Sequence, residues 1–550
     1  MNTERIRAER VAGAPPEAGT EEVHNQTTTP VLESCVKYAC YTGLTNKPHY
    51  WNPMLIHTPT HTWLKQLTVS YLPGPSTPLA NRVASDLMEF LHQEGHTTQE
   101  LPSADTDVIL TTARLGEPLG WREAFMFTAR RRYKLNHVPT VFTIIHATHQ
   151  QFDDLLSEAE TILRSGVEST PRFAGIPETA SRTLYQQGKR GGAIMYLLRI
   201  IQLQIKSIRV LLVVGDEKPD SAFVFDLVGA HPQIRNNEPQ IFYKDIVTRI
   251  VTAASTQEIT RHRAVEPEVK REVWDSLPTI QYMTQASQEL GKRDFFTEMI
   301  HVSDVAEIPG FSDAISQQYS EGCFATWDVD IDGLVTTITG SARPVRKENI
   351  TDKDLAVIVG VKPERDGALI RKVEGHPNHP PSSEAVEMIG MDVKLPRITL
   401  PLSGGAQVPV IRSKLHGHRG VRSFNRDQVE YVSIPESYLY YPVSCSTDAQ
   451  YRAVQEAFAS SGALKNPEDP RQIVFTVLPG HGVVIVEKWI EDKQPFQVIW
   501  EGMDHRDIEI SNDIPQGPFV FQTDVQRATL AGESDSMNFH AHDAHETHGH

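Results

Sequence analysis

Residues 67–95, LTVSYLPGPSTPLANRVASDLMEFLHQEG, contain the signals that decide the fold. The first part, LTVSYL, is rich in β-branched and aromatic residues and ends at a Pro-Gly turn, which is typical of a strand. After the turn, apolar residues recur at helical spacing until Gly95. These residues are Leu79, Val83, Leu87, Phe90 and Leu91. The stretch therefore predicts a strand followed by a helix, which is one βα unit.

The βα pattern repeats downstream. Further apolar runs predicted as strands are DTDVILTTA (105–113), VPTVFTIIHA (138–147) and SIRVLLVVGD (207–216). The helical patterns between them cover about 120–135, 153–165 and 185–205. Strands that alternate with helices at this spacing usually pair in parallel, and the helices cover both faces of the sheet. We therefore expect a mostly parallel sheet in this part of the chain.

The pattern of apolar and charged residues changes twice in the remaining sequence. Residues 240–300 are helical and charged, and they lead into FATWDVDIDGLVTTITG and DLAVIVGV, which indicate a second α/β domain. After the Pro-rich loop GHPNHPPSSE, short apolar runs between Gly, Pro and Asp indicate a β-rich region. The predicted fold class is α/β, with two doubly wound Rossmann-like domains followed by a β-rich C-terminal domain. The predicted parts are a flexible leader (1–60), an α/β domain (61–240), a second α/β domain (241–390), the β-rich domain (391–527) and a His-rich disordered tail (528–550).

Composition limits the function classes. The chain has 550 residues and a formal net charge of −17, which disfavours a nucleic-acid partner bound by bulk electrostatics. Its four cysteines form no disulfide framework, which indicates a reducing compartment. The N-terminus shows no secretory signal, and the apolar stretch 194–214 is interrupted by charged residues. We therefore expect a cytoplasmic protein that does not associate with membranes.

The sharpest local motif is DVDIDG, residues 328–333, in which three aspartates alternate with apolar residues. Carboxylates this close repel one another unless solvent or a bound cation relieves them. As a calcium loop the motif has acids at positions 1, 3 and 5 and Gly at position 6, but Thr339 stands where a bidentate Glu is required. Three alternatives follow: a calcium loop, a solvated acidic turn, and a catalytic site for a divalent metal.

The run GCFATWDVDIDGLVTTITGSARPV resembles a segment of the L-fucose/L-arabinose isomerase-like family. In that family a pattern of the form acid-x-Asp-x-x-Gly-Ala-Leu-Thr is followed by a helix, a Gly and a Pro-containing turn. Asp328 matches the first acid, which is usually Glu, and Asp330 matches the metal-binding Asp. The three-part layout of the chain is also similar to that of the family.

This resemblance implies a Mn²⁺ site, or one for another divalent metal, built from a Glu, an Asp and a His. By their places in the sequence these are Glu307, with Asp304 as the substitute, Asp330 and His481, and Glu307 and Asp330 are the catalytic residues. The implied activity is aldose–ketose isomerisation of a small sugar through an ene-diol. The resemblance also implies a homo-oligomer. Because Asp replaces Glu at 328, a non-catalytic sugar-binding or scaffold protein of the same fold is an alternative.

His416 and His418 form a His-x-His pair, which on a strand places both imidazoles on one face and suits Zn²⁺. With His481 in LPGHGVVIVEKW, the pair resembles the class II aldolases, whose metal is held by a His-x-His pair and a third His. Those enzymes also need a carboxylate base, and no upstream residue matches it well. A lyase of this kind is therefore the second enzymatic alternative. The structural alternative makes His416 and His418 exposed turn residues.

Two turn motifs in the first α/β domain bear on ligand binding. PGPSTP at 73–78 opens a helix and offers backbone N–H groups to an anion, but it lacks the spacing of a nucleotide-binding loop. VVGDEKPD at 213–220 ends a strand at the edge where α/β sheets bind ligands.

Overall fold

The computed structural model describes sixteen stretches of the unit Ile56–His550, and every structural statement here refers to them. They are residues 64–115, 132–137, 139–168, 172–173, 176–177, 208–225, 233–256, 259–296, 322–339, 347–377, 379–385, 399–405, 407–417, 420–435, 446–478 and 482–511. The predicted leader, the predicted tail, the predicted helix 185–205 and most of the predicted helix 120–135 lie outside them.

The first sheet has seven strands in the order β2-β1-β3-β4-β7-β8-β9. Its first five members pair in parallel, and β8 and β9 continue it antiparallel. This confirms the mainly parallel sheet that the βα pattern predicts. The strands are β1 (Thr68–Leu72), β2 (Thr97–Gln99), β3 (Val108–Arg114), β4 (Thr140–Ala147), β7 (Ile208–Val214), β8 (Ser221–Phe225) and β9 (Gln233–Arg235).

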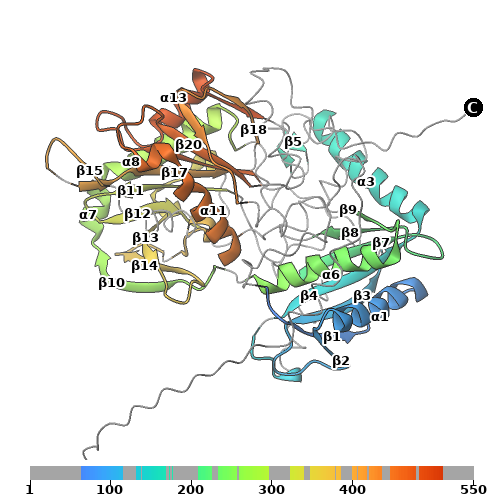
Figure 1. Ribbon diagram of the computed structural model, residues 1–550. Coiled ribbons are helices and arrows are strands. Elements are labelled where there is room, and N and C mark those ends of the chain that lie inside the picture. The colour runs from blue at the N-terminus through green and yellow to red at the C-terminus, as the bar shows by residue number, and fades with distance from the viewer. Residues whose placement is uncertain are drawn as a thin grey trace, which may run out of the picture. The chain divides into compact units, whose positions relative to one another are not determined.

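Two helices bury apolar residues against one face of this sheet, α1 (Pro78–Gln93) and α6 (Pro239–Ser255) (Figure 1). Helix α1 begins where Thr77 caps the N–H of Ala80 and Pro78 occupies the first turn. Its predicted apolar positions pack on the strands, and burying such a side chain contributes roughly 1.5–3 kcal/mol. A third helix, α3 (His149–Glu168), follows β4.

The second sheet has nine strands in the order β10-β14-β13-β12-β11-β17-β21-β20-β19. Its neighbouring strands from β14 to β20 all pair antiparallel, and only the two outermost pairs are parallel. The strands are β10 (Arg263–Val269), β11 (Cys323–Asp328), β12 (Gly333–Thr337), β13 (Leu355–Val361), β14 (Ala368–Val373), β17 (Ile411–Gly417), β19 (Val429–Tyr431), β20 (Ile473–Leu478) and β21 (Gly482–Lys488).

This mixed sheet stands in place of the second doubly wound sheet and the separate β-rich domain that the sequence suggests. β11 lies in the segment predicted as a second α/β domain, whereas its partner β17 lies in the segment predicted as β-rich. Both segments therefore contribute strands to one sheet. The physical reason is the short connections, such as Val329–Asp332 between β11 and β12, because a few residues join antiparallel strands but cannot make a parallel crossover.

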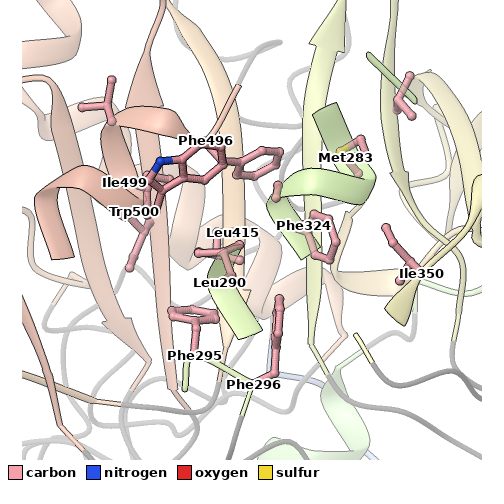
Figure 2. Packing of buried hydrophobic residues seen from close by; sticks show 14 of the residues in the cluster. Met283, Leu290, Phe295, Phe296, Phe324, Ile350, Leu415, Phe496, Ile499 and Trp500 are labelled. Carbon is pink, nitrogen blue, oxygen red and sulfur yellow. The ribbon is translucent and has the colours of Figure 1, made fainter. Parts of the chain in front are cut away.

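Helices cover both faces of the nine-stranded sheet. On one face pack α7 (Arg271–Ser276), α8 (Pro278–Lys292) and α13 (Gln497–Asp504), around a cluster that includes Phe324 (Figure 2). On the other face pack α11 (Asp448–Ser460) and α12 (Gly462–Lys465). The remaining elements are η5 (Lys347–Asn349), η6 (Asp352–Asp354) and three short ladders: β5 (Arg172–Phe173) with β6 (Ile176–Pro177), β15 (Thr399–Pro401) with β16 (Gln407–Pro409), and β18 (Gly420–Phe424) with β22 (Ile508–Ser511).

Among the described helices, none combines the length and the apolar content that crossing a bilayer requires. The stretch 194–214 ends in strand β7, and its residues before 208 lie outside the described part of the chain.

Candidate functional site

The DVDIDG motif forms the hairpin turn between β11 and β12, where Asp328 pairs with Gly333. Oδ1 of Asp328 accepts the N–H groups of Asp330 (2.9 Å) and Ile331 (3.1 Å), and Asp328 is 4% exposed. Asp330 and Asp332 are exposed. An Asp whose oxygen accepts backbone N–H groups two and three residues later is ordinary turn chemistry. The geometry therefore favours the solvated acidic turn over the calcium loop.

The metal set implied by the isomerase resemblance is only partly visible. Asp330 lies on this exposed turn, whereas Glu307, its substitute Asp304 and His481 lie outside the described residues. Within the described residues, no three or more His, Cys, Asp or Glu side chains are arranged to hold a metal ion. The set Glu307, Asp330 and His481 therefore stays a prediction.

A different group of polar side chains gathers at one end of the nine-stranded sheet, which we call the His416 end. Because the central strands alternate in direction, the start of one strand lies beside the end of the next. The residues that define this end are Cys323, Thr337, Leu355, Gly417 and Gly482. The segment Pro380–Ala385 joins them, because Thr339 N–H donates to the Pro380 carbonyl (2.8 Å) and Ser382 N–H to the Thr337 carbonyl (3.0 Å).

His416 is the central residue of this end. It lies near the end of β17, opposite Cys323 in β11 and Val484 in β21, and it is 1% exposed. The alternative in which His416 is an exposed turn residue is therefore wrong, because β17 continues through it to Gly417. Its Nδ1 lies 3.1 Å from the carbonyl oxygen of Val483. A carbonyl only accepts, so Nδ1 carries a proton and donates.

Glu384 approaches His416 from the Pro380–Ala385 segment. Oε1 of Glu384 lies 3.5 Å from Nε2 of His416, and the Glu384 residue is 8% exposed. In the neutral imidazole, the protonated Nδ1 leaves a lone pair on Nε2 that faces this side of the ring. The Nε2 lone pair of His416 and the Oε1 atom of Glu384 are both rich in electrons and lie 3.5 Å apart. A proton or a cation close to both atoms is therefore favoured. The pair is thus suited to hold a metal ion or to move a proton.

Lys347 adds a cationic group to the same end. It is 5% exposed on η5, and its carbonyl accepts the hydroxyl of Ser287 from α8. Gly291 permits this close approach, because a Cβ there would lie 2.6 Å from Cβ of Glu348. Burial lowers the pKa of Lys347, and the charges of Cys323, Glu384 and Asp354 act in the opposite direction.

The other two histidines of the aldolase resemblance, His418 and His481, lie outside the described residues. Their sequence neighbours are described: Gly417 ends β17, Gly482 begins β21, and Gly417 pairs with Val483. Gly417 and Gly482 therefore both lie at the His416 end.

The donor chemistry of this end fits a Zn²⁺-type ion. A metal-ligating His commonly donates its other ring N–H to a backbone carbonyl, and His416 donates Nδ1–H to Val483. Zn²⁺ takes imidazole nitrogen as a ligand, and Nε2 of His416 is the ring nitrogen that the Val483 contact leaves as a donor atom. Sequence reasoning missed Glu384 because it follows a Pro-rich stretch read as a domain boundary. The only available signal was the acidic end of PPSSE.

Comparison of this chain with known protein families, with curated proteins and with solved structures finds no match. The functional argument therefore rests on the residues themselves.

Proposed function

We propose that this chain is a metal-dependent lyase that cleaves a carbon–carbon bond in a small sugar or related hydroxy-carbonyl compound. The observation that carries the proposal is the 3.5 Å approach of the Glu384 carboxylate to Nε2 of the buried His416. The aldolase resemblance implies a carboxylate base as well as three histidines, and the approach of Glu384 to one of these histidines, His416, supports it. The buried surroundings favour polar catalysis, because electrostatic interactions strengthen where water is excluded.

In this proposal His416 would hold the metal through Nε2, with its ring oriented by the Val483 carbonyl, and His418 and His481 would be the further ligands. When bound, a divalent ion polarises the carbonyl of the substrate. Glu384 is the base: its Oε1 takes the proton of the hydroxyl group next to the bond that breaks. The electron pair of that bond passes to the fragment that carries the carbonyl. Glu384 then returns its proton to the carbon of this same fragment at which the bond broke.

Aldose–ketose isomerisation is the competing outcome, with Mn²⁺ at Glu307, Asp330 and His481. It uses the same polarised carbonyl and a proton transfer between neighbouring carbons, but no carbon–carbon bond breaks. A non-catalytic sugar-binding or scaffold protein is the third candidate, after the lyase and the isomerase. The exposed position of Asp330 in a hairpin turn gives the isomerase ligand set less support than the buried His416–Glu384 pair gives the lyase.

Metal content separates these outcomes. The full chain is stripped with a chelator, offered Zn²⁺ or Mn²⁺, dialysed and analysed by mass spectrometry. The variants are His416→Ala and Asp330→Asn, with His92→Ala, at an exposed position of helix α1, as control. The terminal histidines are present in every variant, so they cancel in the differences. The lyase proposal expects His416→Ala alone to lose tightly held Zn²⁺.

Product analysis completes the test. The wild-type protein with Zn²⁺ or Mn²⁺ is incubated with a panel of ketoses, aldoses and their phosphates, and the products are followed by ¹³C NMR. Two shorter fragments support the lyase. Interconversion of aldose and ketose, together with Mn²⁺ lost in Asp330→Asn, supports the isomerase and contradicts the lyase. Equal metal in all variants with no conversion identifies the non-catalytic protein.

A further inference from the structure

The carboxyl edge of the seven-stranded sheet gathers a second set of reactive side chains, independent of the His416 end. The strand order changes direction between β1 and β3, because the chain passes from β1 to β2 on one side and then to β3 on the other. Ligands in open α/β sheets bind at such a reversal, beyond the carboxyl ends of the strands. The motifs PGPSTP and VVGDEKPD both end at this edge, and His146, near the end of β4, contacts both of them.

The two hydrogen bonds of His146 fix where its proton lies. Its Nε2 is 2.7 Å from the carbonyl oxygen of Gly215, and its Nδ1 is 2.8 Å from Oγ1 of Thr77. Because the carbonyl only accepts, Nε2 carries the proton. In the neutral imidazole Nδ1 is then an acceptor, so the hydroxyl of Thr77 donates its proton to His146. A hydroxyl that donates to an imidazole nitrogen has the same arrangement as a hydroxyl nucleophile and its general base.

A second contact makes the Thr77 oxygen more acidic. Oγ1 also accepts the N–H of Ala80 (3.2 Å) in the first turn of α1. An N–H donor and the positive end of a helix both stabilise negative charge on this oxygen. The neighbouring Ser76 does not share this arrangement, because its hydroxyl donates to Oδ1 of Asn81 (2.8 Å). Thr77 therefore differs from the serine beside it in having both an acid-strengthening donor and a base.

The loops around the pair are held in place. Gly74 N–H donates to Oγ1 of Thr112 (2.9 Å), which in turn donates to the Gly74 carbonyl (3.0 Å). A Cβ at Gly74 would lie 2.2 Å from the Thr112 carbonyl oxygen, and one at Gly215 would lie 1.9 Å from the Lys218 carbonyl oxygen. Both glycines are therefore needed for this geometry, which presents the hydroxyl to its base without rearrangement.

The surroundings indicate the substrate class. Thr77 is half-buried, whereas Arg114, His149 and Asp220 at the same edge are exposed. Nε of Arg114 donates to the carbonyl of Ser76, the residue before Thr77 (3.3 Å). A guanidinium beside a reactive hydroxyl suits a substrate with a carboxylate or phosphate group.

We propose that Thr77 and His146 form a second catalytic site that hydrolyses small anionic esters. Oγ1 of Thr77 attacks the acyl carbon, and its proton passes to Nδ1 of His146. The alcohol departs with that proton as the ester C–O bond breaks, which leaves an acyl-Thr77. Water then attacks the acyl group, gives its proton to Nδ1, and releases the acid as Thr77 regains a proton from His146.

A fluorophosphonate reagent tests the first half of this reaction, because Oγ1 displaces fluoride at phosphorus and the adduct remains. The full chain is treated with the reagent, digested and analysed by mass spectrometry. We expect an adduct on Thr77 in the wild-type protein, in Thr77→Ser and in the control Ser76→Ala. The rate should fall about 10²–10⁴-fold in His146→Gln, which removes the base.

Thr77→Asn separates reactivity from folding. Asn caps a helix as well as Thr but has no hydroxyl, so the helix is kept and the adduct should disappear. Circular dichroism checks that each variant is folded. Burst release of p-nitrophenol from p-nitrophenyl succinate should follow the same order of variants. If folded wild-type protein and Thr77→Ser both lack an adduct at residue 77, the pair is only a structural latch and the proposal is overturned.

Discussion

His146 in the seven-stranded sheet and His416 in the nine-stranded sheet are both buried, and a backbone carbonyl holds one ring nitrogen of each. The carbonyl takes Nε2 of His146 but Nδ1 of His416. The opposite nitrogen faces a hydroxyl in the first case and a carboxylate in the second. This difference shows how the backbone can set the chemistry of a histidine. The ring nitrogen that donates to the carbonyl keeps the proton, so the other nitrogen keeps the lone pair. One imidazole is then suited to activate an alcohol, and the other to bind a cation.

The largest expected effect is a fall in kcat when the carboxylate next to His416 is removed. Glu384→Gln keeps the shape of the side chain but cannot act as a base, so kcat for a substrate found in the panel should fall about 10²–10⁴-fold. Steady-state kinetics measure the change. Glu364→Gln, at an exposed position in the turn between β13 and β14, is the control and should leave kcat unchanged. Equal kcat in the two variants would remove Glu384 from the mechanism.

The second prediction concerns the core around Phe324, on the face of the nine-stranded sheet opposite to His416. Phe324 packs against Phe296 and Phe496, with ring centroids 5.8 and 5.7 Å away (Figure 2). Phe324→Ala should lower the free energy of unfolding by about 3–5 kcal/mol through the cavity it leaves. Denaturant titration measures the loss. The conservative Phe324→Leu should lose less, and a loss no greater for Ala than for Leu would mean that the ring does not fill its site.

A third prediction uses a buried carboxyl next to the strand of His416. Burial raises the pKa of Glu487 to about 7, although Ser413 and the N–H groups of Phe496 and Ile499 donate to it. In the unfolded chain its value is the ordinary 4.5. The folded state therefore holds this proton more tightly, so the stabilisation is complete below pH 4.5 and is lost as the pH rises to 7.

The expected loss for Glu487 is about 3 kcal/mol over that range, and Glu487→Gln should remove it. Thermal melts at several pH values measure the slope. Asp469 is the matched contrast, because its hydrogen bond with Arg471 lowers its pKa to about 2 and its stabilisation is lost only as the pH falls below 3.8. A stability profile of Glu487→Gln as steep as that of the wild type would contradict the assignment.

A fourth prediction compares two threonine caps. Thr77 caps α1 and Thr447 caps α11, and a lost cap typically costs about 1 kcal/mol. Thr77→Ala also removes the donor that faces buried His146, which costs roughly a further 1–3 kcal/mol. The free energy of unfolding should therefore fall more in Thr77→Ala than in Thr447→Ala. Equal losses would mean that the Thr77–His146 contact adds nothing to stability.

The smallest effect is spectroscopic. ¹⁵N shifts of the ring nitrogens at neutral pH should report a proton on Nε2 of His146 and on Nδ1 of His416 in the neutral rings. Single His→Gln variants assign the signals. The same tautomer at both positions would break the comparison directly.

The first sheet was predictable because its signals are local. Thr77, Pro78 and the apolar spacing from Leu79 to Leu91 specify α1 without any distant contact, and the apolar strands follow at βα spacing. The nine-stranded sheet could not be predicted in the same way, because the pairing of β11 with β17 joins residues far apart in the chain. No periodicity within either segment specifies a partner strand.

The candidate site was predictable only in part. His416 stood out by its His-x-His spacing, but its burial depends on where β17 ends, which local propensity does not fix. Glu384 lies in a segment without periodicity, and it reaches His416 only because Ser382 pairs with the end of β12. Asp328 stood out in the sequence for its charge, but its carboxylate accepts the N–H groups of Asp330 and Ile331 and so stabilises the turn. Long-range backbone pairing therefore supplied what side-chain pattern did not.

The register of β11 against β17 sets Cys323 directly opposite His416. Facing residues of an antiparallel pair have Cβ atoms about 4.5–5.5 Å apart, which lets two imidazoles reach a single ion. Cys323→His would therefore place a second imidazole directly opposite His416. The register of β11 against β17 thus determines which side chain lies next to His416.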